Sequence, residues 1–184
     1  MCHWGVSTAV VASALHAECR GFESVIAHLI NKDKKSIMEK LFKLLSDGQA
    51  SLFVLFQKTW IYHWDVVGPD FHQLHTLFGE QYNTMFEEID TLTEHMRYLT
   101  MKPVSTLTRI TEVSQIDQAS NSAQEIDANE MIRQLRDDNK KIIEIFSEVS
   151  EEADRQKQFA TSNLVQTIIE THGKFHWMLR SFLE

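Results

Sequence analysis

Four segments of the chain repeat their apolar residues at steps of three and four, which is the period of an amphipathic α-helix. They span residues 32–67, about 71–99, 127 to about 155, and about 159–184. No segment alternates apolar and polar residues over a useful length, so we expect helices and no sheet. The apolar positions are Ile37, Leu41, Leu44, Leu45, Leu52, Leu55 and Phe56; Leu74, Leu77, Phe78, Met85, Ile89, Leu92 and Met96; Met131, Ile132, Leu135, Ile142, Ile145, Phe146 and Val149; and Leu164, Ile168, Ile169, Phe175, Trp177, Met178 and Leu179.

Helix-breaking residues separate the first three segments. Gly68 and Pro69 end the first helix, and Asp70 offers an N-terminal cap to the second. Lys102-Pro103 ends the second helix, and the polar stretch 103–126 is a long connection with room for one short helix. Asp127 is a candidate cap for the third helix, with Glu130 three residues on, as in a capping box.

Four long helices, one long crossover between the second and third, and two short turns describe an all-α, ferritin-like four-helix bundle. We expect residues 32–184 to form this domain and residues 1–31, which are small, apolar and poor in lysine, to form an N-terminal extension. A chain of 184 residues is long enough to bury a core, and its two prolines and six glycines permit long helices.

Charge and composition narrow the function. The formal net charge of −8 argues against nucleic-acid binding that depends on Lys and Arg, and suits a protein that handles cations. The sequence has no run of 18 or more apolar residues, so we expect no membrane-spanning helix. Residues 7–15 resemble the short apolar region of a signal peptide, but the residues before them contain no Lys or Arg, so we do not expect a cleaved signal. Cys2 and Cys19 do not make a disulfide framework, so we expect free thiols in a reducing, cytoplasmic environment.

Three candidate metal ligands flank the turn between the first two predicted helices, and two more lie farther along the second helix. His63, His72 and His75 lie close together in sequence, and Asp90 and Glu94 share one helix face farther on. Imidazole and carboxylate together suit iron and zinc, although such residues on a helix are often only solvated. His75 and Asp90 would lie roughly 22 Å apart along one helix, so a shared ion would require a second subunit related by a two-fold axis.

The stretch HWDVVGPDFHQLHTLF, with Asp90 and Glu94 after it, resembles the Dps family of mini-ferritins (DNA-binding proteins from starved cells), as does the tail ETHGKFHWMLRSFLE. The resemblance implies a hollow homododecamer that oxidises iron(II) with hydrogen peroxide or oxygen and stores ferric mineral against oxidative stress. It also implies a ferroxidase site at a two-fold interface, with His63 and His75 from one subunit and Asp90 and Glu94 from the other. Trp64 matches an aromatic residue of the family and also suits interface packing.

The chain departs from the family at the site itself. The family usually has Asp or Glu four residues after the second histidine, where this chain has Gly79. Our hypothesis is that His72 or a water molecule completes the site, which would then hold iron(II) or zinc relatively better and iron(III) worse.

Two further departures from the family concern the pore by which iron enters and the binding of DNA. Family members often carry acidic residues at the start of the last helix, where they line an iron entry pore. In this chain Thr161 fits that pattern, but Gln158 and Asn163 stand in place of the acidic residues. A pore lined by amides attracts cations less strongly. Residues 1–31 contain a single basic residue, Arg20, so we expect no useful DNA binding. Cys2 and Cys19 lie in this extension with His3, His16 and His28, in a spacing that matches no zinc motif.

Two alternatives to the ferroxidase remain. A cage that sequesters metal with weak ferroxidase activity would follow from the altered site at Gly79. A conventional ferritin or di-iron oxygenase would carry Glu-x-x-His motifs, and the sequence has none.

Overall fold

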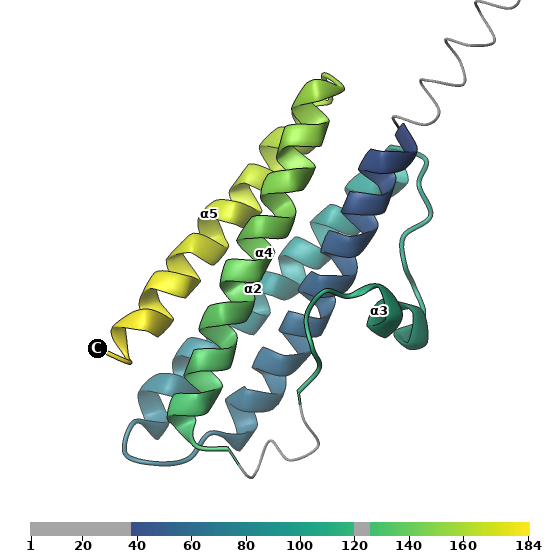
Figure 1. The fold of residues 1–184 in the computed structure, drawn as a ribbon. Coiled ribbons are helices and arrows are strands. Elements are labelled where there is room, and N and C mark those ends of the chain that lie inside the picture. The colour runs from purple at the N-terminus through teal and green to yellow at the C-terminus, as the bar shows by residue number, and fades with distance from the viewer. Residues whose placement is uncertain (1–37, 120–125) are drawn as a thin grey trace, which may run out of the picture. The chain divides into compact units, whose positions relative to one another are not determined.

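The computed structural model describes residues 38–119 and 126–184, and the regular structure in these ranges is entirely helical. Helix 38–65 is followed by α2 (Phe71–Tyr98), the short α3 (Leu107–Val113), α4 (Ala128–Arg155) and α5 (Phe159–Ser181), as Figure 1 shows. Within the described residues the predicted helices are therefore confirmed to within a few residues. The predicted start of the first helix, residues 32–37, lies outside the described residues. None of these helices is long and apolar enough to cross a membrane.

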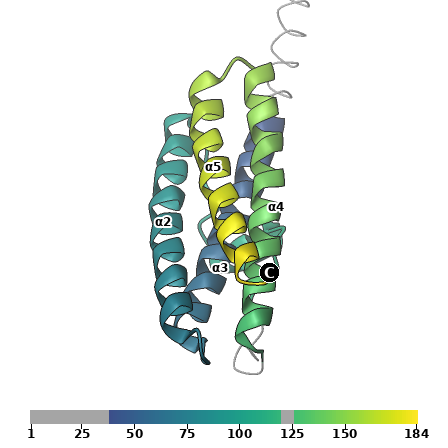
Figure 2. The same cartoon turned by 90° about the vertical axis from the view of Figure 1, so that its left-hand side faces the viewer.

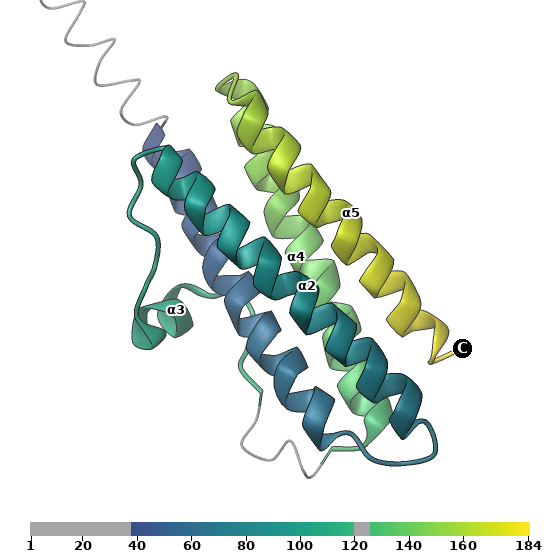
Figure 3. The same cartoon turned by 180° about the vertical axis from the view of Figure 1, so that it is seen from behind.

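The four long helices form a bundle of two helical hairpins. Helix 38–65 and α2 are joined at one end, and α4 and α5 at the other (Figures 1 and 3). The end of α2 and the start of α4 lie at opposite ends of the bundle, so α2 and α4 run in the same direction (Figure 1). Seen from the side, α5 lies between α2 and α4 (Figure 2). This is the predicted crossover architecture.

The helix ends follow the sequence signals in part. Gly68 has a φ of +121°, which suits glycine at the turn between the first two helices. The Asp127 carboxylate accepts a hydrogen bond from the Glu130 backbone N–H at 2.7 Å, and therefore caps α4 as predicted. Asp70 stands at the N-cap of α2 but its side chain makes no cap hydrogen bond, so that part of the prediction is wrong.

Among the described residues, the core is built from the predicted apolar positions, with Trp177 as the exception. Ile37 lies outside the described residues. Trp177 does not face the core, because 56% of it is exposed. Gly48 allows helix 38–65 to approach the ring of Phe146 on α4, since a Cβ at position 48 would lie 2.9 Å from Cε1 of that ring. Core packing therefore fixes the relative height of these two helices.

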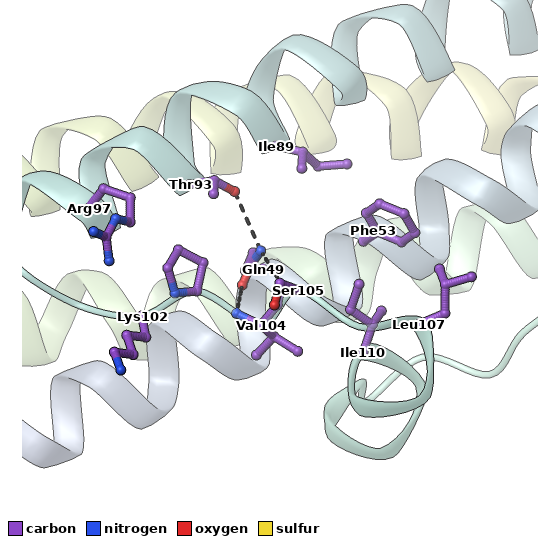
Figure 4. A pocket seen from close by; sticks show the side chains of 11 residues that line it. Gln49, Phe53, Ile89, Thr93, Arg97, Lys102, Val104, Ser105, Leu107 and Ile110 are labelled. Atoms are coloured by element: carbon purple, nitrogen blue, oxygen red, sulfur yellow. Dashed lines mark hydrogen bonds between the residues drawn. The ribbon is translucent and has the colours of Figure 1, made fainter.

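Polar contacts join helix 38–65 to the crossover and to α4. The amide of Gln49 both donates to the Val104 carbonyl at 3.0 Å and accepts from the Val104 N–H at 2.9 Å. Figure 4 shows this pair beside a cavity of about 590 Å³ under the crossover. The Lys58 ammonium, which is 4% exposed, donates to Asp138 on α4 at 2.7 Å.

Candidate metal centre

The site begins with two histidines that meet where the chain turns back. His63 lies in the last turn of helix 38–65 and His75 near the start of α2. Their rings stack with centroids 3.8 Å apart and planes inclined by 21°. His63 Nδ1 lies 2.7 Å from the carbonyl oxygen of His75, and His75 Nδ1 lies 2.7 Å from the carbonyl oxygen of His63. Each histidine therefore orients the other.

These two hydrogen bonds determine which nitrogen atoms can bind a metal. A carbonyl oxygen only accepts, so Nδ1 carries the proton in both rings. In a neutral imidazole the other nitrogen, Nε2, then has the lone pair. A backbone carbonyl in this position is a common way to fix the tautomer and orientation of a metal-binding histidine. The His63–His75 pair thus offers two pre-oriented nitrogen ligands.

Aromatic side chains surround the pair and lie partly in solvent. Phe71 stacks on His75 with centroids 5.2 Å apart, and Tyr82 contacts His63 edge-on at the same distance. Trp60 and Trp64 contact each other at 5.0 Å and are 44% and 51% exposed. This aromatic face of helix 38–65 and α2 continues through Phe53, Phe56 and Phe86.

Gly79 lies against His63. A Cβ atom at position 79 would be 3.1 Å from Cε1 and 3.3 Å from Nδ1 of the His63 ring. The absence of a side chain therefore does more than remove a carboxylate from the sequence pattern. It lets the imidazole of His63 lie close to α2, in the position where it stacks on His75.

The other predicted ligands do not join the pair within one chain. Asp90, Glu94 and His72 are all exposed on α2. Within residues 38–119 and 126–184, no three His, Cys, Asp or Glu side chains converge to hold a metal ion. One chain therefore supplies two nitrogen ligands at one end of α2 and two exposed carboxylates farther along it.

The segment predicted to line an entry pore is built around a buried hydroxyl. Thr161 is fully buried, and its Oγ1 lies 2.9 Å from Nε2 of His95. Burial lowers the pKa of His95. Gln158 stands at the N-cap of α5 and Asn163 is exposed. The cysteines and histidines of the extension lie outside the described residues.

Sequence reasoning missed two buried polar features of the core, one around His172 and one at Gln81. His172 on α5 is fully buried, between Asn139 on α4 and Glu88 on α2. The signal was present in the sequence, because His172 and Asn139 fall on the apolar stripes of their helices. The same holds for Gln81 on α2, which is fully buried and whose side-chain amide has no hydrogen-bond partner among the described residues.

The chain is similar in sequence to known proteins. A model of the ferritin-like domain family matches residues 42–184. The DNA protection during starvation protein of Brevibacillus brevis is 32% identical over 154 residues, which cover 82% of this chain and 99% of that protein. DNA protection during starvation protein 2 of Bacillus anthracis is 32% identical over 149 residues, which cover 81% and 97%.

Solved structures agree with these sequence matches. The Dps structure from Thermosynechococcus elongatus has a TM-score of 0.77 at 28% identity, covering 81% of this chain and 93% of that one. A Dps structure from Vibrio cholerae O1, described as a member of a superfamily of ferritin-like diiron-carboxylate proteins, has a TM-score of 0.75 at 27% identity and covers 81% and 92%. The likeness therefore extends over the whole bundle.

Proposed function

Since the chain belongs to the Dps family of ferritin-like proteins, we propose that it is a ferroxidase. It oxidises iron(II) at sites between two subunits, with hydrogen peroxide or oxygen as the oxidant. The ferric product is stored as mineral inside a hollow homododecamer in the cytoplasm, which protects the cell against oxidative stress.

The observation that carries this proposal is the His63–His75 pair. Both Nε2 atoms are free of the backbone hydrogen bonds that hold the rings. Neutral imidazole nitrogen is a suitable ligand for iron(II) and for zinc, which we expect to compete for the same site. Each ring is held in its orientation by the other residue's carbonyl group, which supports the pair as a set of ligands oriented before metal binds.

A second copy of the chain would supply the carboxylates. His75 and Asp90 lie on one helix, roughly 22 Å apart at the usual rise, so they serve different ions in one subunit. A two-fold axis across α2 would bring Asp90 and Glu94 of one copy to the histidines of the other. The exposed aromatic face around Trp60 and Trp64 gives such a contact an apolar centre, as interfaces between identical subunits usually have.

The chemistry then divides between the two kinds of ligand. His63 and His75 hold iron(II), and the harder carboxylates of Asp90 and Glu94 stabilise iron(III) as it forms. One hydrogen peroxide takes one electron from each of two iron(II) ions and leaves as two water molecules after it accepts two protons. The acidic net charge of −8 favours cations and does not favour DNA as a partner.

Gly79 favours an alternative function, a cage that sequesters metal and oxidises it slowly. Without a carboxylate at position 79, the nitrogen-rich half of the site has less affinity for the ferric product. His72 or a water molecule remains our candidate for the vacant ligand position, and His72 is exposed and lies on the same helix.

Oxidation of iron(II) under peroxide or oxygen, followed by the absorbance of the ferric product, tests both functions. The ferroxidase predicts that His75→Ala slows oxidation at least tenfold, while the matched change His176→Ala on α5 leaves it unchanged. Equal rates in both variants would contradict the proposal. The sequestering cage predicts slow oxidation by the unaltered protein and a rise of at least tenfold in Gly79→Asp.

The placement of the ions needs a second measurement. Crystals soaked with iron(II) and measured at the iron edge should show metal bound by His63 and His75 of one subunit and by Asp90 and Glu94 of another. The same map decides whether His72 is a ligand. Metal elsewhere, with none at the His63–His75 pair, would refute the site.

A further inference from the structure

A row of aromatic contacts along helix 38–65 joins the cavity under the crossover to the end of the helix that carries His63. Phe53 lines the cavity and contacts Phe56 with ring centroids 5.9 Å apart. Trp60 continues the row, because it contacts Phe56 at 6.0 Å and Trp64 at 5.0 Å. The cavity and Trp64 therefore lie on one face of the subunit, at opposite ends of this aromatic row.

The cavity of about 590 Å³ presents an apolar surface that one subunit does not cover. Its apolar walls include Phe53 on helix 38–65, Ile89 on α2, and Leu107 and Ile110 on α3, as Figure 4 shows. Leu107 is 69% exposed, so this surface is in contact with solvent. Burying such a surface against an apolar side chain from outside the subunit is favourable.

Opposite charges accompany the two ends of this face. Arg97 and Lys102 line the cavity, and neither forms an ion pair with another described residue. Asp65 lies next to Trp64, and Asp70 lies just beyond the turn. Neither carboxylate forms an ion pair within the described part of the chain, and Asp70 makes no cap hydrogen bond. The Trp64 end of the face is therefore complementary to the cavity end in both charge and polarity.

A two-fold axis brings two such complementary ends together twice. In a contact between identical surfaces, residue i of one copy meets residue j of the other, and j meets i. Trp64 follows His63, which stacks on His75, so Trp64 lies at about the height of position 75 of α2. The α2 residues that line the cavity are centred on Thr93. An axis midway between these two heights crosses α2 at about position 84.

The candidate metal ligands, which do not line the cavity, require the same axis. Asp90 and Glu94 of one copy reach the height of His75 of the other when the axis crosses α2 at about positions 82–85. The large apolar side chain of Phe86 lies close to this point and is 62% exposed. Two unrelated sets of residues therefore place the second copy in the same register.

We propose that Trp64 of each subunit fills the cavity beneath the crossover of its partner, with Asp65 and Asp70 lying near the partner's Arg97 and Lys102. The contact rests on the proposed function in one respect, which is that two subunits pair across α2. It gives Trp64 a positioning role, because the occupied cavity sets the register in which carboxylates of one subunit reach histidines of the other.

Cross-linking of the full chain tests the position of Trp64. The variant Trp64→Cys/Thr93→Cys is made in the background Cys2→Ser/Cys19→Ser and treated with a short bismaleimide. Positions 64 and 93 of one subunit are roughly 27 Å apart in height, so a short link between them must join two subunits. We expect most of the protein to run as a dimer on a denaturing gel.

The matched controls carry one cysteine each, Trp64→Cys or Thr93→Cys in the same background, and should remain monomers on the gel. A double variant that sediments as an assembly but gives no more dimer than these controls would overturn the contact. That result would leave the cavity to another occupant, such as the N-terminal extension.

A double-mutant cycle tests the contact without cysteines. Trp64→Ala and Leu107→Ala should each weaken subunit association about tenfold, measured by sedimentation on dilution. If the two side chains touch, the combined variant should lose much less than the product of about a hundredfold. Both side chains are more than half exposed in one subunit, so the variants should fold, which circular dichroism checks. Effects that multiply, or no effect of Trp64→Ala, would overturn the contact.

Phe159→Ala combined with Leu107→Ala is the matched control cycle, because Phe159 is 62% exposed on α5, and its effect should multiply with that of Leu107→Ala. The assay of iron oxidation is independent of both tests. Coupling of Trp64 to Leu107 together with unchanged oxidation in His75→Ala would support the contact and refute the ferroxidase site. Slow oxidation in His75→Ala without that coupling would do the reverse.

Discussion

Gly79 and the imidazole of His63 leave no room for a methyl group between them. The Cβ of an alanine at position 79 would lie 3.1 Å from the ring, so the ring would have to move by a few tenths of an ångström. Since the ring also stacks on His75, such a shift disturbs the whole His63–His75 pair.

The change Gly79→Ala should therefore separate stability from metal binding. Alanine favours the helix by about 1 kcal/mol over glycine. We expect the free energy of unfolding to stay within about 1 kcal/mol of its original value. A ring forced from its rotamer costs on the order of 1 kcal/mol, so cobalt(II) affinity at the pair should fall about fivefold. Calorimetric titration measures this affinity, and an unchanged value would show that His63 tolerates the methyl group.

The tautomers of His63 and His75 can be observed directly. Both rings should carry their proton on Nδ1, because both Nδ1 atoms face carbonyl oxygens at 2.7 Å. Nitrogen-15 NMR of the metal-free protein at neutral pH distinguishes Nδ1–H from Nε2–H by chemical shift. Rings with the proton on Nε2 would contradict the reciprocal hydrogen bonds.

A comparison of two glycines tests the packing of the bundle. Gly48→Ala would place Cβ 2.9 Å from the Phe146 ring, and should lower the free energy of unfolding by about 1–3 kcal/mol despite the gain in helix propensity. Gly173→Ala on α5 is the control. Its Cβ would have no neighbour within 4 Å, so we expect a gain of up to about 1 kcal/mol. Denaturant unfolding checks both, and equal effects would argue against close packing at Gly48.

Tyr62 should make the stability sensitive to alkaline pH. Burial, with smaller contributions from Asp138 and Glu130, raises the pKa of Tyr62 to about 12 from 10.0. Below pH 10 the phenol is protonated in both states. Between pH 10 and 12 it ionises mainly in the unfolded chain, so the free energy of unfolding falls by about 2–3 kcal/mol over this window.

Denaturant midpoints of the unaltered protein and of Tyr62→Phe, measured across that window, isolate this contribution. The phenylalanine variant lacks the hydrogen bond to Gln134 at every pH, but should lose less stability as the pH rises. Parallel pH profiles for the two proteins would show that Tyr62 does not titrate as expected.

Local signals predicted the helices well because their causes are local. The three- and four-residue apolar spacing, Gly68 and Asp127 each act within a few positions. Asp70 and Asp127 show the limit of prediction from local sequence signals. Asp127 has the extended backbone, with ψ of 167°, that brings a capping side chain to the free N–H groups, whereas Asp70 has ψ of 16°. The residue type was visible in both cases and the backbone angle was not.

The candidate site was only half predictable for a similar reason. Sequence spacing identified His63 and His75, but their reciprocal hydrogen bonds depend on how helix 38–65 pairs with α2. The buried His172 was passed over because an isolated polar residue in an apolar stripe has no meaning until its neighbours are known. Trp177 was assigned to the core by its hydrophobicity, although it lies about 200° around α5 from the buried Phe175.

The crossover also has a kinetic consequence. Because α2 and α4 run in the same direction, helix 38–65 meets α4 through residues far apart in sequence, such as Lys58 and Asp138 at a separation of 80. The α4–α5 hairpin closes locally, with Ser150 and Ser162 only 12 positions apart. Long loops close more slowly than short ones, so the two hairpins should form early and their docking should limit the folding rate. We expect the two hydrogen bonds between Gln49 and Val104 to form in the last step, when the crossover packs against the assembled bundle.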